Sequence, residues 1–199
     1  HYQQERKSYA IFGQADINLT EALVLTVGAR YTTDKSSYDD AYAYLFVGAV
    51  GVADTPIATT IPCNGPAGSC AYNPALRLAL SDSGNALTGR IALSYTMADD
   101  TLVYASYNRG YRAGAVNGGG YTSSAGISFI EPERVNAYEV GIKGRAMDGR
   151  LTLAASAFYY DYSNQQLQDT RTGAVSFLVN APASKVYGYE TEATFRPMP

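Results

Sequence analysis

Apolar and polar residues alternate along several long segments of this chain. In residues 23–31, the odd positions are apolar, whereas Thr26, Gly28 and Arg30 lie between them. Residues 87–97 and 151–159 repeat this period, and residues 9–19 follow it apart from Phe12, which breaks the alternation. A period of two gives a strand one apolar and one polar face. The pattern therefore predicts long β-strands with two chemically different faces.

The connections between the expected strands alternate between short and long. Short turns are expected at about 18–22, 98–100 and 148–149, and long loops at 34–85, 113–130 and 163–182. Outer-membrane β-barrels have short periplasmic turns and long extracellular loops. We therefore predict an all-β, antiparallel transmembrane barrel segment in a bacterial outer membrane. Its seven strands are expected at about 7–20, 23–33, 86–97, 101–111, 134–144 and 150–162, with a last strand that ends at Pro197.

Seven strands indicate that the segment belongs to a larger barrel. Bacterial single-chain barrels close with an even number of strands, and an open sheet edge cannot face lipid. We therefore expect residues 1–199 to be part of a barrel domain, with residues 34–85 as a long extracellular loop. The chain has no run of 18 apolar residues that would form a membrane helix. Its polar first residues lack the apolar core of a signal peptide, so we expect the chain to start within a longer or processed protein.

Tyrosine and cysteine usage agrees with this compartment. The chain has 18 tyrosines, six phenylalanines and no tryptophan. Tyrosine suits membrane–water interfaces, but it also suits carbohydrate-binding surfaces. Cys63 and Cys70 flank a short loop rich in glycine and proline, which favours a disulfide over two free thiols and implies an oxidising compartment. The net charge of −3 offers no basic field for nucleic acid.

A series of motifs resembles the barrel of TonB-dependent outer-membrane receptors. In chain order, they are SYAIFGQAD (8–16), LVLTVGARYTTD (23–34), VYASYNRGYRAG (103–114), EPE (131–133) with YEVGIK (138–143), FYYDY (158–162), and NA (180–181) with GYETE (188–192). Together they cover most of the chain outside residues 35–85.

The resemblance implies active import of a scarce small molecule: a ferric siderophore, haem, cobalamin or an oligosaccharide. Such receptors form a barrel of about 22 strands that an N-terminal plug occludes, and they contact the TonB complex through their N-terminal region. No plug, TonB-contacting segment or C-terminal strand is found in the sequence. We therefore expect this chain to supply part of the barrel wall, in contact with outer-membrane lipid, and three surface loops. The rival function within the barrel class is a passive diffusion channel.

The candidate ligand contacts lie where strands are expected to enter the surface loops. They are Tyr111, Arg112, Asn117 and Tyr121, and the Cys63–Cys70 region joins them through its loop. Loops longer than a hairpin needs are often functional, and glycines permit movement on binding. The alternative is that these loops shield the barrel and do not touch ligand. Tyr111 and Tyr121 suit stacking on a ligand and membrane-interface anchoring equally well.

Strand phase places a second set of charged residues on the lumen side: Arg30, Arg90, Glu139, Glu190 and Glu192. The two arginines suit anionic ligands or plug carboxylates. Alternatively, they balance the carboxylates of the wall itself. Arg109 falls on the outward face near the upper rim, within reach of lipid headgroups.

Catalysis has little support in this sequence. The single histidine is His1, so a nucleophile–histidine pair within the segment is not expected. Glu190 and Glu192 lie two residues apart, which fits two solvated carboxylates better than a paired-carboxylate site. We expect no enzyme activity, cofactor or metal site. The rival from another structural class is a secreted, tyrosine-rich β-sandwich that binds carbohydrate.

Overall fold

The computed structural model describes residues 3–41, 78–97, 101–117, 128–170 and 177–197. Seven strands form one antiparallel sheet in the order β1-β2-β3-β4-β7-β8-β9, and β5 and β6 form a small separate hairpin. The prediction of a seven-stranded antiparallel sheet is therefore confirmed. The bounds are β1 Gln3–Asn18, β2 Leu23–Ala41, β3 Leu78–Thr96, β4 Leu102–Arg112, β5 Ala115–Asn117, β6 Ser128–Ile130, β7 Glu133–Ala146, β8 Leu151–Asp169 and β9 Phe177–Phe195.

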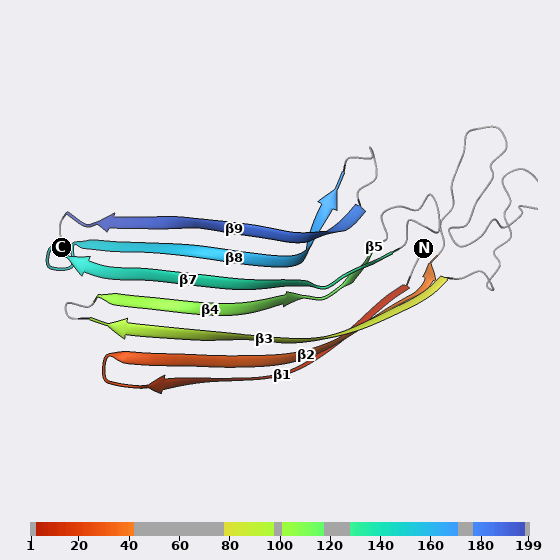
Figure 1. The fold of residues 1–199 in the computed structure, drawn as a ribbon, viewed down its shortest axis with the longest axis horizontal. Coiled ribbons are helices and arrows are strands. Elements are labelled where there is room, and N and C mark those ends of the chain that lie inside the picture. The colour runs from red at the N-terminus through yellow and green to blue at the C-terminus, as the bar shows by residue number, and fades with distance from the viewer. Residues whose placement is uncertain (1–2, 42–77, 98–100, 118–127, 171–176, 198–199) are drawn as a thin grey trace, which may run out of the picture.

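Consecutive strands of the main sheet lie side by side (Figure 1). The short turns all lie at one end of the sheet, which we call the turn end, and the long connections leave the opposite loop end. The Asp148-Gly149 turn was predicted from its dipeptide. Met147, Asp148 and Gly149 have positive φ values of 54°, 55° and 83° there. Tight two-residue hairpin turns require this left-handed backbone conformation.

Several strands extend further than the alternation predicted. β2 continues to Ala41 and β3 starts at Leu78, so the connection between them covers residues 42–77 and not 34–85. β8 and β9 likewise extend to Asp169 and from Phe177. The extensions of β2 and β8 are mostly polar, whereas those of β3 and β9 begin with apolar residues, so backbone pairing continues where the regular alternation has ended. β5 and β6 lie within residues 113–130, which the sequence predicted as a loop.

The pairing register is continuous across the sheet and defines its two faces. One cross-strand row contains Ala15, Val27, Ile91, Tyr107, Tyr138, Tyr159 and Tyr187. The neighbouring row contains Asp16, Thr26, Ala92, Ser106, Glu139, Phe158 and Gly188. Side chains of adjacent rows point to opposite sides of a sheet. We call the first side the apolar face and the second the polar face.

Phe12 does not interrupt this arrangement. It pairs with Arg30 on the polar face, and the Arg30 guanidinium lies 5.9 Å from the centre of its ring. A cation above an aromatic face is attracted by the ring quadrupole. The apparent break in the alternation is therefore an aromatic residue on the polar face, and the register of β1 does not change.

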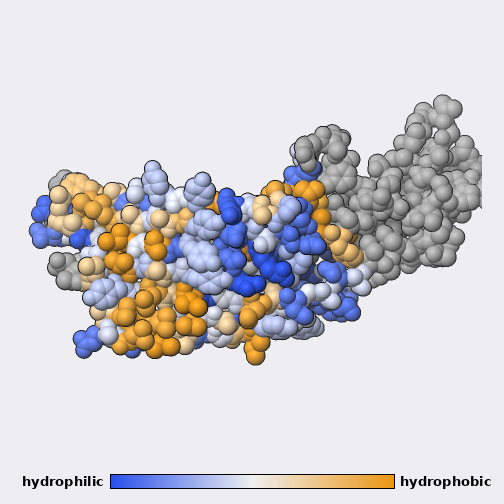
Figure 2. Space-filling model, viewed as in Figure 1, coloured by the Kyte–Doolittle hydropathy of each residue, from blue (hydrophilic) through white to orange (hydrophobic). Residues whose placement is uncertain are grey.

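The apolar face is exposed because the main sheet is a single layer. Ile11 is 75% exposed and Tyr189 is 83% exposed, and no large side chain among the described residues is fully buried. Figure 2 shows apolar surface over the turn-end half of the strands, with a hydrophilic band beyond it. A continuous apolar surface of this kind requires an apolar partner. Within the described ranges, no helix has the length and apolar character needed to cross a membrane.

The sheet forks towards the loop end. The pairing of β3 with β4 ends at Gly89 and Arg109. Beyond this point β3 stays paired with β2 as far as Leu78, whereas β4 stays paired with β7 as far as Arg112. The sheet therefore divides into two arms, β1–β3 and β4–β9, and we call the region between them the fork.

Candidate functional site

The five charged residues predicted to face the lumen all lie on the polar face. Arg30 and Arg90 come from β2 and β3, whereas Glu139 comes from β7 and Glu190 and Glu192 come from β9. Asp16 of β1 and the cations Lys143 and Arg145 of β7 lie on the same face, so both signs of charge occur on both sides of the sheet. Among the described residues, no ion pair joins either arginine to a glutamate. The arrangement leaves both charge types open to groups outside this segment.

A tyrosine fixes the orientation of Glu139 on this face. The Tyr104 hydroxyl donates a hydrogen bond to Glu139 Oε1 at 2.5 Å. The Tyr104 ring lies over Gly141, where an added Cβ would approach its ring atoms to 2.6 Å. Gly141 therefore lets the ring lie flat against the wall, and this explains the glycine of the YEVGIK motif.

The glycine of the GYETE motif has the same local role. A Cβ on Gly188 would lie 2.9 Å from Phe158, whose ring stacks on Tyr160 with a centroid separation of 5.0 Å. Aromatic rings that cover glycines of the neighbouring strand support local strand pairing.

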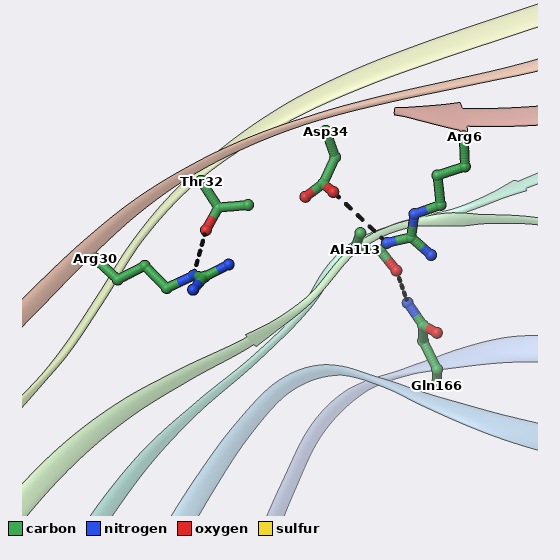
Figure 3. Close-up of polar contacts among 6 residues, drawn as sticks. All are labelled: Arg6, Arg30, Thr32, Asp34, Ala113 and Gln166. Atoms are coloured by element: carbon green, nitrogen blue, oxygen red, sulfur yellow. Dashed lines mark hydrogen bonds and ion pairs between the residues drawn. The ribbon is translucent and has the colours of Figure 1, made fainter. Parts of the chain in front are cut away.

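Buried polar residues occupy the fork between the two arms. Arg6 of β1 forms an ion pair with Asp34 of β2 at 3.7 Å, and Arg30 Nε donates to Thr32 Oγ1 at 3.1 Å (Figure 3). Thr32, Asp34 and Ser36 are buried although their face is polar.

The Tyr111 hydroxyl is also buried, and no hydrogen-bond partner for it is found among the described residues. A Cβ on Gly84 would lie 3.2 Å from this hydroxyl.

Gln166 fastens the base of the β5–β6 hairpin to the sheet. Its Nε2 donates to the carbonyl oxygens of Ala113 and Glu131, at 3.0 and 3.1 Å, and these residues stand on either side of the hairpin. Its backbone N–H donates to Glu133 Oε2 at 2.8 Å. Gln166 is buried, so these bonds are shielded from water. Figure 3 shows Gln166 reaching Ala113 from β8, close to the Arg6–Asp34 pair.

Two asparagines complete this fastening. Asn180 Nδ2 donates to the carbonyl oxygens of Glu131 and Asn164, and Asn180 Oδ1 accepts from the Glu131 N–H. Asn164 Nδ2 donates to Glu131 Oε2 at 2.7 Å. Asn164 has a φ of 54°, and it stands at an unpaired position in the β8–β9 ladder opposite Pro182, which has no N–H to donate. β8 bends at its loop end (Figure 1).

The described residues include three of the predicted ligand contacts, namely Tyr111, Arg112 and Asn117. Arg112 is exposed at the end of β4 and pairs with Glu133 of β7. Tyr111 points into the fork, where its hydroxyl is buried. Asn117 lies in β5 opposite Ser128. Tyr121 lies outside the described residues, as do Cys63 and Cys70.

Sequence reasoning missed the residues that fasten the loop. Gln166, Asn164 and Asn180 fell within the predicted loop 163–182, where no periodic pattern separates them from ordinary polar residues. The only available signal was the NQQ run at 164–166 and the NAP sequence at 180–182. Amide side chains donate and accept at once, so they suit backbone groups that a hairpin leaves unpaired.

Replacing Gln166 with leucine should release the β5–β6 hairpin. The change leaves the Ala113 carbonyl without its donor and removes one of the two side-chain donors of the Glu131 carbonyl. An unsatisfied buried acceptor costs about 1–3 kcal/mol. Hydrogen–deuterium exchange on the full-length protein should show faster exchange in 113–117 and 128–131. The matched control is Gln168→Leu, because Gln168 is exposed on the same strand. Equal exchange in both variants would contradict the fastening role.

The polar face presents groups that can contact other molecules. The described residues contain no group of three or more His, Cys, Asp or Glu side chains able to hold a metal ion. The polar face presents charged side chains, aromatic rings that lie flat against the sheet, and the hairpin base that Gln166 holds. These are the features of a wall that contacts other molecules.

Comparison with known families gives a match over nearly the whole chain. The profile described as "TonB dependent receptor-like, beta-barrel" matches residues 1–196. The catecholate siderophore receptor Fiu of Escherichia coli K12 is 25% identical over 167 residues, which are 81% of this chain and 20% of that receptor. The pesticin receptor of Yersinia enterocolitica is 30% identical over 111 residues, 54% of this chain and 16% of that receptor. The chain therefore spans about a fifth of the length of these relatives.

Solved structures share the fold. The ferric yersiniabactin uptake receptor FyuA of Yersinia pestis superposes with a TM-score of 0.71 and 20% identity, covering 100% of this chain and 25% of that one. The ferric-catecholate import receptor Fiu from E. coli K12, in its closed form, gives a TM-score of 0.66 at 20% identity, covering 100% and 26%. The main sheet therefore has the geometry of a segment of such barrels.

Proposed function

This chain belongs to the TonB-dependent receptor β-barrel family of the bacterial outer membrane, and we propose that it supplies wall and surface loops for TonB-energised uptake of a ferric siderophore. The siderophore class is suggested by relatives named as receptors for catecholate siderophores and for ferric yersiniabactin. Transport requires the complete receptor, of which this segment is one part.

The single-layer sheet with two chemically different faces carries this proposal. Its apolar face needs an apolar solvent, and its polar face needs water or polar partners; the wall of a membrane barrel provides both. We assign the apolar face to lipid and the polar face to the lumen. All long connections leave the same end of the sheet, which we assign to the cell surface.

The charged residues of the polar face then line the lumen. Arg30 and Arg90 suit the carboxylates of a plug or an anionic ferric chelate, because guanidinium groups bind carboxylates in a bidentate manner. Glu139, held by Tyr104, and the glutamates of β9 suit cationic plug residues.

The ligand mouth is assigned to the loop end. Arg112 is exposed there, and the hairpin fastened by Gln166 follows it in the chain. Tyr121, Asn117 and the Cys63–Cys70 region join this mouth through their loops. Tyr111 is better suited to supporting the loop base than to touching ligand, because its hydroxyl is buried in the fork.

Uptake of labelled ferric siderophores by cells that carry the full-length receptor tests this function. We expect saturable uptake that disappears when TonB is deleted. Removal of residues 118–124 should lower the affinity while the barrel still folds and inserts. Uptake that is linear in concentration and independent of TonB would instead show a passive channel. Unchanged affinity and uptake after the deletion would mean that this loop only covers the mouth.

A further inference from the structure

The apolar face ends at a polar row on four neighbouring strands. This row contains Arg109 of β4, Asn136 of β7, Asp161 of β8 and Lys185 of β9, which pair with one another in register. The same row contains Gly13, Ala29 and Gly89 on β1, β2 and β3. The polar row is therefore local to β4–β9 and does not surround the whole segment.

A row of four tyrosines lies directly on the turn side of this polar row. Tyr107 and Tyr138 have ring centroids 5.1 Å apart, and Tyr138 and Tyr159 have centroids 6.4 Å apart. The Tyr107 hydroxyl donates to Asn136 Oδ1 at 2.8 Å, so it points from the aromatic row towards the polar row. Tyrosines place the ring in the apolar layer and the hydroxyl in the headgroup layer. The polar row thus lies at headgroup depth.

The two cations of the row are available to a ligand. Arg109 and Lys185 are both exposed. The ion pairs found in the described part of the chain are Arg6–Asp34 and Lys7–Glu5, so Asp161 does not neutralise either cation at close range. Arg134, which is also exposed, lies two residues beyond Asn136 on the same face of β7. The polar row together with Arg134 therefore has three cations and one anion, Asp161.

We propose that Arg109 and Lys185 bind phosphate groups of outer-leaflet lipid headgroups. The inference rests on the proposed function, which assigns the apolar face to lipid. An arginine binds phosphate through two parallel N–H donors, and a lysine binds it as a point charge. Three strand spacings separate the two residues, roughly 14 Å, so each cation takes its own phosphate. A headgroup with two phosphates, or two neighbouring lipids, fits this spacing.

The experiment uses the full-length receptor in neutral detergent. The probe is a purified, phosphorylated outer-leaflet glycolipid, compared with the same glycolipid after enzymatic removal of its phosphates; retained lipid is counted by native mass spectrometry. We expect retention of the phosphorylated form only. The double variant Arg109→Gln/Lys185→Gln should weaken that retention about tenfold or more. Asp161→Asn should strengthen it, because it removes the only acid of the row.

The matched control is Arg145→Gln, which removes a cation from the polar face at the turn end. It should retain lipid as the wild type does. The inference is overturned if the dephosphorylated glycolipid is retained equally, or if the double variant retains lipid normally. Displacement of the glycolipid by millimolar inorganic phosphate would also overturn it, in favour of a site for soluble anions.

Siderophore uptake by the same variants separates this inference from the proposed function. If the double variant loses phosphate-dependent lipid retention but keeps normal TonB-dependent uptake, the lipid site is supported as a feature separate from transport. TonB-dependent uptake in a wild-type receptor that shows no phosphate preference would leave the transport function standing and refute the lipid site alone.

Discussion

Replacing Leu93 with arginine should destabilise the folded receptor by about 2–4 kcal/mol, the cost of a cation on the lipid face near the bilayer midplane. Leu93 lies near the middle of the apolar stretch of β3, directly between Leu25 of β2 and Ala105 of β4. It is exposed on the face that we assign to lipid, so an arginine there would meet lipid and not protein. Denaturant titration of the full-length receptor in lipid bilayers would measure the change in the free energy of unfolding.

The neighbouring residue provides the control for this substitution. Ser94 lies on the polar face, between Val24 and Tyr104. Because this face is assigned to the aqueous lumen, Ser94→Arg should cost much less than Leu93→Arg. If both variants lose the same stability, the alternation does not distinguish lipid from lumen, and the assignment of the two faces is wrong.

Replacing Gly89 with alanine should also be costly, by about 1–3 kcal/mol, because it overpacks a tight backbone contact. A Cβ on Gly89 would lie 2.5 Å from the carbonyl oxygen of Gly28, an atom of the neighbouring backbone that has no flexible side chain to move away. Gly89 is also the last residue of β3 that pairs with β4 before the fork. We expect faster amide exchange along the β2–β3 pair in addition to the loss of stability.

Gly28→Ala is the matched control for this prediction. It adds the same methyl group to the adjacent strand, but the new Cβ would lie 3.6 Å from its nearest neighbours, which belong to the Gln14 side chain. This is ordinary van der Waals contact, so stability should change little. If both variants lose the same stability, the effect comes from replacing any glycine in a strand and not from the contact between Gly89 and Gly28.

The tertiary features of this segment depend on residues far apart in the chain. Gln166 bonds to Ala113, 53 residues earlier, and Asn180 bonds to Glu131, 49 residues earlier. No local pattern encodes such partners, because a polar residue in a loop looks the same whether it is solvated or buried. The Tyr111 hydroxyl illustrates the same point: sequence placed it at the mouth, and the fork of the sheet buries it.

The sequence by itself determined the seven strands, their two faces and the tight turn at Asp148-Gly149, because alternation and turn residues act locally. It also determined the family, through motifs whose glycines, such as Gly141 and Gly188, let aromatic rings lie flat. Only the tertiary structure decided where pairing ends, where the sheet forks and which charges share a row. These features depend on the register of the sheet. Register is set by pairing between strands, so the sequence of one strand alone does not specify it.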